Sequence, residues 1–333
     1  MKRIDFEAHY YTQSFLDAAS NRSGIPSYDP ETRSMYHGGD GLLPIRPIVP
    51  ELLDLGEERI KRMDEAGIDM AMLSISIGIE QLPAEIGVRE AVKNHDLLYE
   101  AMKKYPGRFG GCAVLAVSDI GASLAELERC GKELGFRCWN AFSNYGDKRL
   151  DDEYFFPLLG KAAELGMYVY IHPTFPTARD LHGYGAGMAG SGFGFALDVA
   201  TTLIRMIFNG VFDRLPDLKV MIGHLGEGIP FLMQRLDDAN SRMGSCGGKA
   251  RNMKAPSEYF SSNIWVSTSG NFSKAAFECA KTVFGMDHIV FGTDYPMERM
   301  EENITFINSL PLPMTDFEKL YFGNAETYFG IKI

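Results

Sequence analysis

The chain has 333 residues, of which 45% are hydrophobic and 23% charged, and its formal net charge is −11. This balance is typical of a soluble globular protein, and the length allows a large core in one domain or two. The negative net charge argues against a nucleic-acid-binding surface, which needs a basic face. The five cysteines are scattered and form no CxxC pair, which argues against a disulfide scaffold and a thiolate zinc cluster.

We expect a cytoplasmic protein with no membrane partner. No apolar run reaches membrane-spanning length, and the N-terminus enters a polar strand without the apolar region of a signal peptide.

Short apolar runs typical of strands alternate with amphipathic helical patterns along the chain. The predicted strands are residues 4–7, 70–77, 109–115, 136–142, 167–171, 219–222, 264–267 and 288–291. The predicted helices are residues 57–66, 88–105, 118–134, 153–165, 196–208, 229–240 and 273–284, with closing helices at 298–310 and 315–322. Eight strands with helices between them predict an α/β fold, a (β/α)8 TIM barrel forming a single domain over residues 1–333. An open doubly wound sheet would alternate similarly, but no GxGxxG motif follows the first strand.

Three long connections interrupt the alternation. Residues 10–50 follow the first strand and residues 174–195 follow the fifth, so both leave the barrel end at which active sites lie. Loops of this length in a compact domain are typically lids or binding loops, or are disordered. The basic segment 241–256 precedes a strand, which places it on the opposite face or at a subunit contact.

Residues that can bind a metal stand at the ends of four predicted strands. Glu7 and His9 are two apart, so a strand would point both side chains the same way, and both are ordinary zinc or manganese ligands. His172, His224 and Asp294 end the fifth, sixth and eighth strands. These five residues would therefore face one mouth of the barrel, although 287 residues separate the first from the last.

Each of these residues also has a plainer explanation. Glu7 could be a solvated strand end, His172 and His224 could be core histidines with satisfied hydrogen bonds, and Asp294 could cap the following segment. Their occurrence together on one rim favours a site. His37 and His182, in the long loops, are lesser candidates for substrate contact.

The set of motifs resembles the amidohydrolase superfamily. The motifs are E-x-H at residues 7–9, His172, Gly-His-x-Gly-Glu at residues 223–227, Val-Ser-Thr-Ser-Gly at 266–270 and Phe-Gly-Thr-Asp-Tyr-Pro at 291–296. More narrowly, the chain is similar to the branch that contains aminocarboxymuconate semialdehyde decarboxylase and the γ-resorcylate and 2,3-dihydroxybenzoate decarboxylases. Hydrolytic members usually begin with H-x-H and often carry a bridging lysine after strand four, where this chain reads Arg-Cys-Trp-Asn-Ala-Phe at residues 137–142.

The resemblance implies a division of roles. Glu7, His9, His172 and Asp294 would bind one divalent ion, Mn²⁺ or Zn²⁺, with a slight preference for manganese and no organic cofactor. His224 and Glu227 would form a pair beside the substrate, with Glu227 fixing the imidazole tautomer. Arg235 resembles a position that contacts the substrate carboxylate in some relatives, although an ion pair with Asp237 or Asp238 is an equal alternative. Three aromatic residues are further candidate substrate contacts: Phe175, Tyr184 and Phe291.

The activity implied by the resemblance is non-oxidative decarboxylation of an ortho-hydroxybenzoate. Direct loss of CO2 would leave an unstable aryl anion, so Asp294 would first protonate the ring carbon that carries the carboxylate. The first alternative is a mononuclear metal-dependent hydrolase or lactonase with Asp294 as general base, and the second is a catalytically silent barrel used for binding or assembly. The expected partner is a small aromatic carboxylate, with the chain in a homo-oligomer, a dimer or tetramer.

Overall fold

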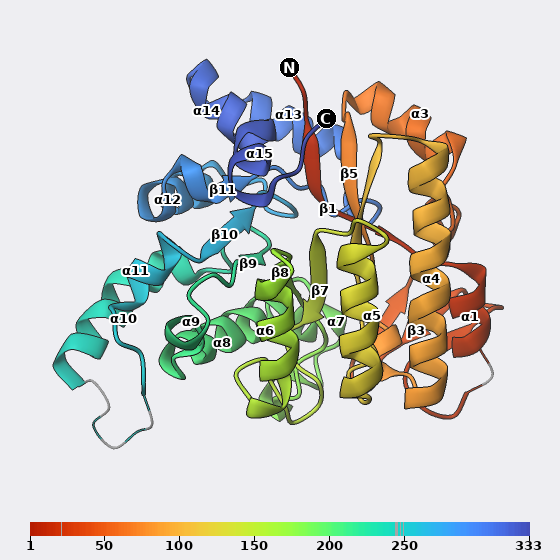
Figure 1. Ribbon diagram of the computed structural model, residues 1–333, viewed down its shortest axis with the longest axis horizontal. Helices are drawn as coiled ribbons and strands as arrows, with labels where there is room; N and C mark the ends of the chain where they lie inside the picture. Colours follow the sequence, from red (N-terminus) through yellow and green to blue (C-terminus); the bar gives the residue numbers. More distant parts are fainter. Residues whose placement is uncertain (21, 244–245, 247, 249) are drawn as a thin grey trace.

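Eight parallel strands form the barrel, as the alternation predicts (Figure 1). The computed structural model describes residues 1–333 apart from residues 21, 244, 245, 247 and 249. The strands pair in chain order and are β1 (Ile4–Tyr10), β5 (Met70–Ile75), β6 (Phe109–Ala113), β7 (Cys138–Phe142), β8 (Tyr168–His172), β9 (Val220–Ile222), β10 (Ile264–Ser267) and β11 (Ile289–Val290).

The last strand returns to the first. The Phe6 amide donates to the Phe291 carbonyl at 2.9 Å, and the Asp294 amide donates to the Glu7 carbonyl at 2.7 Å. A further parallel bridge joins Ala8 to Tyr295 beyond the end of β11. These bonds join two candidate metal-binding residues, Glu7 and Asp294, through the backbone.

A register shift between Asp5 and Ala8 marks a bulge in β1. Within this bulge, Phe6 packs against Tyr168 and Phe329 in an apolar cluster inside the barrel. The next residue, Glu7, lines a cavity at the C-terminal ends of the strands. A bulge re-aims side chains, and here it allows an apolar residue and a carboxylate that are adjacent in sequence to face the same interior.

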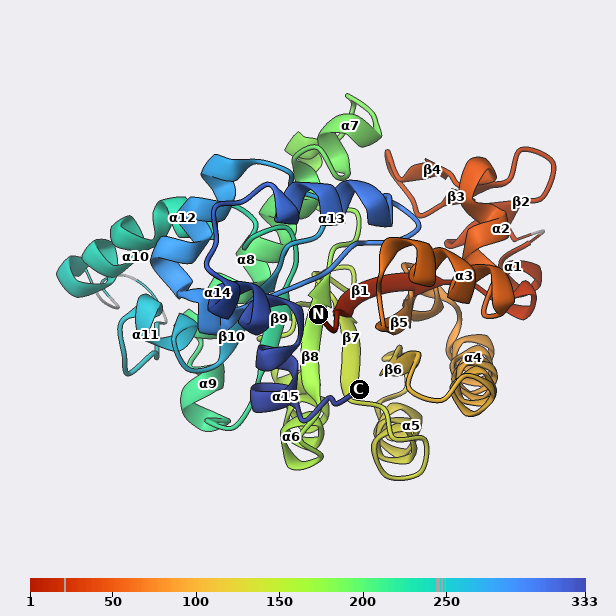
Figure 2. The ribbon, with the colours of Figure 1, turned by 90° about the horizontal axis from the view of Figure 1, so that it is seen from above.

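Helices surround the strands, as Figure 2 shows for α4, α5 and α6. The principal helices are α3 (Glu57–Ala66), α4 (Ala84–Lys104), α5 (Ile120–Lys132), α6 (Phe156–Glu164), α8 (Gly194–Phe208), α10 (Ile229–Met243), α12 (Lys274–Phe284) and α13 (Met300–Asn308). Gly67 closes α3 in the left-handed conformation, at φ 70°. The alternation missed the short helices α9 (Val211–Arg214), α11 (Pro256–Phe260) and α15 (Asn324–Phe329), whose length gives little periodic signal.

The two long loops contain secondary structure of their own. Residues 10–50 hold α1 (Gln13–Ala19), α2 (Val49–Leu52) and an antiparallel sheet of β2 (Ser27–Asp29), β3 (Ser34–Tyr36) and β4 (Leu42–Pro44). The loop after β8 carries α7 (Ala186–Ala189). β3 and α7 lie at the same end of the barrel, opposite the termini (Figure 1). The basic segment 241–256 falls partly outside the described residues.

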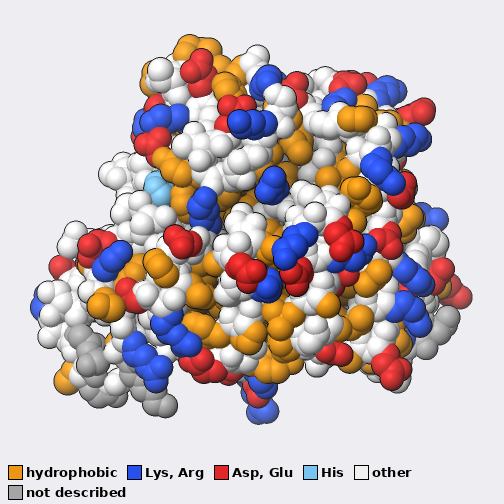
Figure 3. Space-filling view, viewed as in Figure 1, with side chains coloured by type: hydrophobic (Ala, Val, Ile, Leu, Met, Phe, Trp, Pro, Cys, Tyr) orange, Lys and Arg blue, Asp and Glu red, His pale blue; other side chains and the backbone are white. Residues whose placement is uncertain are grey.

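The stretch 186–208, which includes α7 and α8, is long and apolar enough to cross a membrane by length and composition alone, contrary to the expectation that no run would be. Its α8 portion buries Val199, Leu203, Met206 and Ile207 in the hydrophobic core, and core helices of soluble proteins share this composition. Acidic and basic side chains are interspersed over the face of the molecule shown in Figure 3.

Asp5 holds the seam between β1 and β11 together. Its buried carboxylate accepts hydrogen bonds from the Glu7 amide at 3.0 Å, the Thr293 amide at 2.9 Å and the Thr293 hydroxyl at 2.5 Å. Asp5→Ala would leave these donors without partners, and we expect it to lower the free energy of unfolding by about 1–3 kcal/mol. Urea-induced unfolding measures the change.

Asp5→Asn is the matched control, because its amide oxygen still accepts from the two backbone groups. It should cost clearly less than Asp5→Ala. Equal stability of Asp5→Ala and the wild type would contradict this role of the carboxylate.

Candidate metal centre and active site

The Glu7 carboxylate is oriented by two serines from the end of β10. Its Oε2 accepts from the Ser267 hydroxyl at 2.8 Å and from the Ser269 hydroxyl. Its Oε1 is buried and has no partner among the described residues. Gly223 provides room for this arrangement, because a Cβ there would lie 2.7 Å from the Tyr170 hydroxyl and 3.4 Å from Glu7 Oε2. The geometry leaves one carboxylate oxygen available for a cation.

The two imidazoles beside Glu7 are also held in place. His9 Nδ1 lies 3.0 Å from the Ser74 hydroxyl, and the His9 and His172 rings stand 4.8 Å apart, edge to face. His172 Nδ1 donates to the Pro173 carbonyl at 2.7 Å, so its Nε2 carries the lone pair. Burial, together with the nearby His9, lowers the pKa of His172 to about 3. A neutral imidazole with a free nitrogen is a metal ligand.

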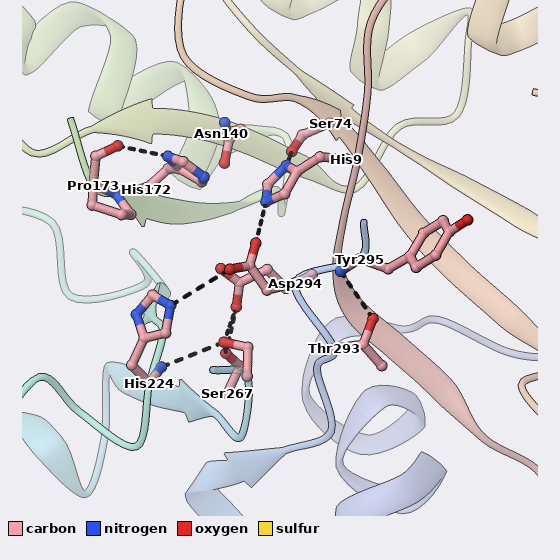
Figure 4. Close-up of polar contacts among 12 residues, drawn as sticks. His9, Ser74, Asn140, His172, Pro173, His224, Ser267, Thr293, Asp294 and Tyr295 are labelled. Atoms are coloured by element: carbon pink, nitrogen blue, oxygen red, sulfur yellow. Dashed lines mark hydrogen bonds and ion pairs between the residues drawn. The ribbon is translucent and has the colours of Figure 1, made fainter. Parts of the chain in front are cut away.

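Asp294 stands between the histidines (Figure 4). Its Oδ1 lies 3.1 Å from His9 Nε2, and its Oδ2 lies 4.0 Å from His224 Nε2. Burial alone would raise the pKa of this carboxyl, but His224 and His9 hold it below its usual range. Its backbone adopts the left-handed conformation, at φ 60°, which a non-glycine residue keeps only where its surroundings fix it.

His224 forms a tight pair with Glu227. The His224 Nδ1 to Glu227 Oε1 distance is 2.6 Å, and both residues have positive φ, 54° and 53°. Burial would lower the pKa of His224, yet the charge of Glu227, the hydrogen bond to Glu227 and the nearby Asp294 carboxylate raise it well above its usual value. His224 is therefore an imidazolium in this arrangement, with one proton directed toward Asp294.

The donor set fits a divalent cation. One oxygen or nitrogen from each of Glu7, His9 and His172 lies within 4.8 Å of the others, and Glu7, His224 and Asp294 form a second such group. The partnerless Glu7 Oε1 is a buried acceptor of the kind that a cation would satisfy. Carboxylate and imidazole ligands without thiolate suit Mn²⁺ and Zn²⁺ alike.

The group opens into a cavity of about 320 Å³, here called the metal cavity. Glu7, His172, His224 and Asp294 line one part of it, and Ile77 and Phe195 are among its apolar walls. This volume is at the lower end of the range for small-molecule sites. It suits a ligand of about one aromatic ring.

Comparison with known proteins places the chain in a family. The family model described as Amidohydrolase matches residues 5–331, nearly the entire sequence. The chain belongs to the amidohydrolase family.

Proteins named as decarboxylases are among the relatives of this amidohydrolase. It is 31% identical over 341 residues to the γ-resorcylate decarboxylase of Polaromonas sp. (strain JS666), covering 99% of this chain and 98% of the relative. The structure of 5-carboxyvanillate decarboxylase from Sphingomonas paucimobilis matches with a TM-score of 0.87 and 29% identity over 99% of both chains. The dihydroxybenzoic acid decarboxylase of Polaromonas sp. JS666, with bound manganese and the inhibitor 2-nitroresorcinol, matches with a TM-score of 0.84 and 29% identity, over 99% of this chain and 97% of that one.

The structure brings the strand-end residues of the amidohydrolase together but not all of the expected substrate contacts. Phe291 is fully buried and packs against Tyr321 behind the barrel wall. Tyr184 is 80% exposed, and Arg235 is exposed on α10. None of these three lines the metal cavity. The side chains of all three point elsewhere within this chain.

Phe175 is the fourth expected contact, and it lines a neighbouring cavity instead. Sequence reasoning also did not select Ser74, Ser267 and Ser269. Ser267 and Ser269 belong to the motif at residues 266–270, which contributes to the family resemblance but does not by itself indicate a role for either serine. Ser74 carried no signal, because a lone serine in a strand is common.

A second cluster of metal-binding residue types lies between α4 and α5. It consists of His95, Glu126 and Cys130. His95 Nε2 accepts from the Val114 amide at 3.0 Å and Nδ1 contacts Glu126 at 2.6 Å, so both ring nitrogens are engaged. Burial, the largest effect, raises the pKa of Cys130, so its thiol stays protonated. This cluster is a buried hydrogen-bond network.

The His224–Glu227 pair yields a test in metal-free protein. We expect histidine NMR to show one imidazole that stays protonated at pH values well above the usual histidine pKa. Glu227→Gln should lower the raised pKa of this imidazole, because the stabilising negative charge is lost. Glu302→Gln, an exposed residue on α13, is the control and should leave the titration nearly unchanged. An unaltered His224 titration in Glu227→Gln would show that the pair does not set its charge.

Proposed function

We propose that this amidohydrolase is a metal-dependent, non-oxidative decarboxylase of an ortho-hydroxybenzoate or a similar aromatic carboxylic acid. The observation that carries the proposal is the His224–Asp294 pair, which faces a one-ring cavity beside a donor set suited to a divalent ion. The named decarboxylases among its relatives support the same reaction class.

Glu7, His9, His172 and Asp294 would hold one divalent cation in this enzyme, with no organic cofactor. When bound, the cation supplies positive charge that orients the carboxylate and ortho oxygen of the substrate. Two carboxylates and two imidazoles favour a hard ion, and we therefore prefer manganese to zinc. The manganese named with the Polaromonas structure supports that choice.

The chain's own residues provide the proton. The pKa of Asp294 is held low while that of His224 is raised, so the single proton of the pair rests on His224 before substrate binds. It passes to the carboxylate-bearing ring carbon through Asp294, which is itself one of the four proposed cation ligands and lines the metal cavity. The electrons of the carbon–carbon bond then return to the ring, CO2 leaves, and the pair takes a new proton from solvent.

The Glu227 side chain positions this proton. Its 2.6 Å contact occupies His224 Nδ1, so that only Nε2 faces Asp294. A negative charge behind the imidazole also keeps it protonated until the substrate is in place.

The alternatives receive less support. A hydrolase or lactonase would use Asp294 as a base for water, but an imidazolium 4.0 Å away favours proton donation. A silent barrel gives no reason for a buried Glu7 oxygen without a partner. Cytoplasmic localisation and a homodimer or homotetramer complete the proposal and rest on the sequence.

The ligand assignment is tested by metal analysis. Glu7→Ala and His172→Ala each remove one donor, and we expect both variants to lose most of the single equivalent of metal while remaining folded. Glu227→Gln is the matched control: it should keep the metal yet lose activity about 10–100-fold, because it disturbs orientation alone. A full equivalent of metal in Glu7→Ala or His172→Ala would refute the assignment.

Asp294→Asn tests the chemistry. A panel of ortho-hydroxybenzoates should release CO2 with the wild type, and turnover in D2O should place one deuterium at the carbon that carried the carboxylate. The metal-loaded variant should be at least ~10²-fold slower, the usual contribution of a positioned acid. Rapid CO2 release by that variant would exclude Asp294 as the proton donor, and the absence of CO2 from every panel member would overturn the proposed function itself.

A further inference from the structure

A second, larger cavity adjoins the metal cavity at the same end of the barrel. It has a volume of about 680 Å³ and is here called the loop cavity. The loops after β5, β6, β7 and β8 surround it, together with the segment between β3 and β4. Tyr154, Phe155 and Phe175 give it aromatic walls. The proposed decarboxylation uses none of these residues.

His37 is a buried polar group of the loop cavity with an unused nitrogen. Its side chain is 4% exposed, and its ring stacks on Phe175 at a centroid distance of 6.0 Å. Nδ1 donates to the Gln81 side-chain oxygen at 2.8 Å, which leaves a lone pair on Nε2. Nε2 has no partner among the described residues. Burial lowers the pKa of His37 to about 4, so the imidazole is a neutral acceptor.

Glu80 provides a second unused atom. One carboxyl oxygen, Oε2, accepts from the Gly78 amide at 2.8 Å, whereas the buried Oε1 has no partner among the described residues. Although the residue as a whole is partly exposed, burial of its carboxyl raises the pKa to about 8. At neutral pH the group is mainly a carboxylic acid, which can donate a hydrogen bond through Oε1.

An aromatic pair stands between the two cavities. Phe175 lines the loop cavity and Phe195 lines the metal cavity, and their rings meet edge to face at 5.0 Å. Close packing fixes Phe175 further, because a Cβ on Gly41 would fall 2.8 Å from its ring. A ligand of the loop cavity would therefore be a separate molecule from the substrate in the metal cavity.

We propose that the loop cavity is a second binding site, for an uncharged hydroxylated aromatic molecule whose hydroxyl groups bond His37 Nε2 and Glu80 Oε1 while its ring packs against Phe175. A neutral acceptor, an acidic donor and aromatic walls favour a phenol. Lys148 at the rim is 43% exposed and 5.7 Å from the Tyr154 ring, so water screens its attraction for an anion. Phenolic products of the proposed decarboxylation belong to this class, but the site itself requires neither metal nor turnover.

Calorimetric titration of metal-supplemented, full-length protein with resorcinol tests the site. We expect saturable binding that persists in Glu7→Ala, which disables the proposed metal site. His37→Phe keeps the stacking on Phe175 but removes the acceptor, and Glu80→Leu removes the donor. Each should weaken binding about tenfold, as loss of one buried hydrogen bond does, whereas Glu80→Gln, neutral and still able to donate, should retain most of it.

Glu85→Leu makes the same chemical change at an exposed position of α4 and should leave binding unchanged. Benzoate should bind more weakly than resorcinol. Absence of saturable binding would overturn the proposal and indicate ordered water at the polar atoms. Binding that is lost in Glu7→Ala but intact in both His37→Phe and Glu80→Leu would place resorcinol in the metal cavity and equally overturn it. Neither result depends on CO2 release, so failure of the loop site and failure of the proposed decarboxylase activity are separate outcomes.

Discussion

The backbone seam between β1 and β11 is the contact on which the site depends. The hydrogen bond from the Asp294 amide to the Glu7 carbonyl places two carboxylates from opposite ends of the chain side by side. Beneath it, the buried Asp5 carboxylate fastens Thr293 to β1 at two points. Asp294 occupies a left-handed backbone conformation that costs of order 1–3 kcal/mol, and the seam is what holds it there. The contacts that close the barrel therefore also assemble the site.

Closure of the barrel brings together charged side chains, each of which would be costly to bury without a partner. Glu7 is buried and Asp294 is largely buried, both within reach of His9, His172 or His224, and an unpaired buried carboxylate costs several kcal/mol. Two features offset the cost within the chain: serine hydroxyls on Glu7 and the imidazolium of His224 near Asp294. Both features leave ligand atoms of Glu7 and Asp294 facing the other metal-binding side chains. The arrangement that stabilises the buried charges therefore also suits a cation. The same atoms around Glu7 and Asp294 therefore contribute to the stability of the fold and to the chemistry of the site.

The sequence predicted the barrel and the residues at its rim because both follow from local patterns. Strand–helix alternation places every strand end at one mouth, which brings His172, His224 and Asp294 together. Other features depended on tertiary detail. The bulge in β1 aligns Phe6 and Glu7 toward one interior, contrary to strict alternation, and no local signal marks it. Phe291 lies near the motif but faces the core, and the small β2–β4 sheet forms from a segment that looked irregular because its strands have three residues each.

The mouth of the barrel is divided between two kinds of chemistry. β1, β9 and β11 supply the charged half. The loops after β5, β6 and β7, together with the segment between β3 and β4, supply a larger hollow in which His37 and Glu80 are neutral. β8 serves both, since His172 ends the strand in one half and Phe175 follows three residues later in the other. A barrel separates such regions readily because each βα loop is anchored to its own strand and can change without moving its neighbours. The Phe175–Phe195 contact is then the boundary between the neutral half and the charged half.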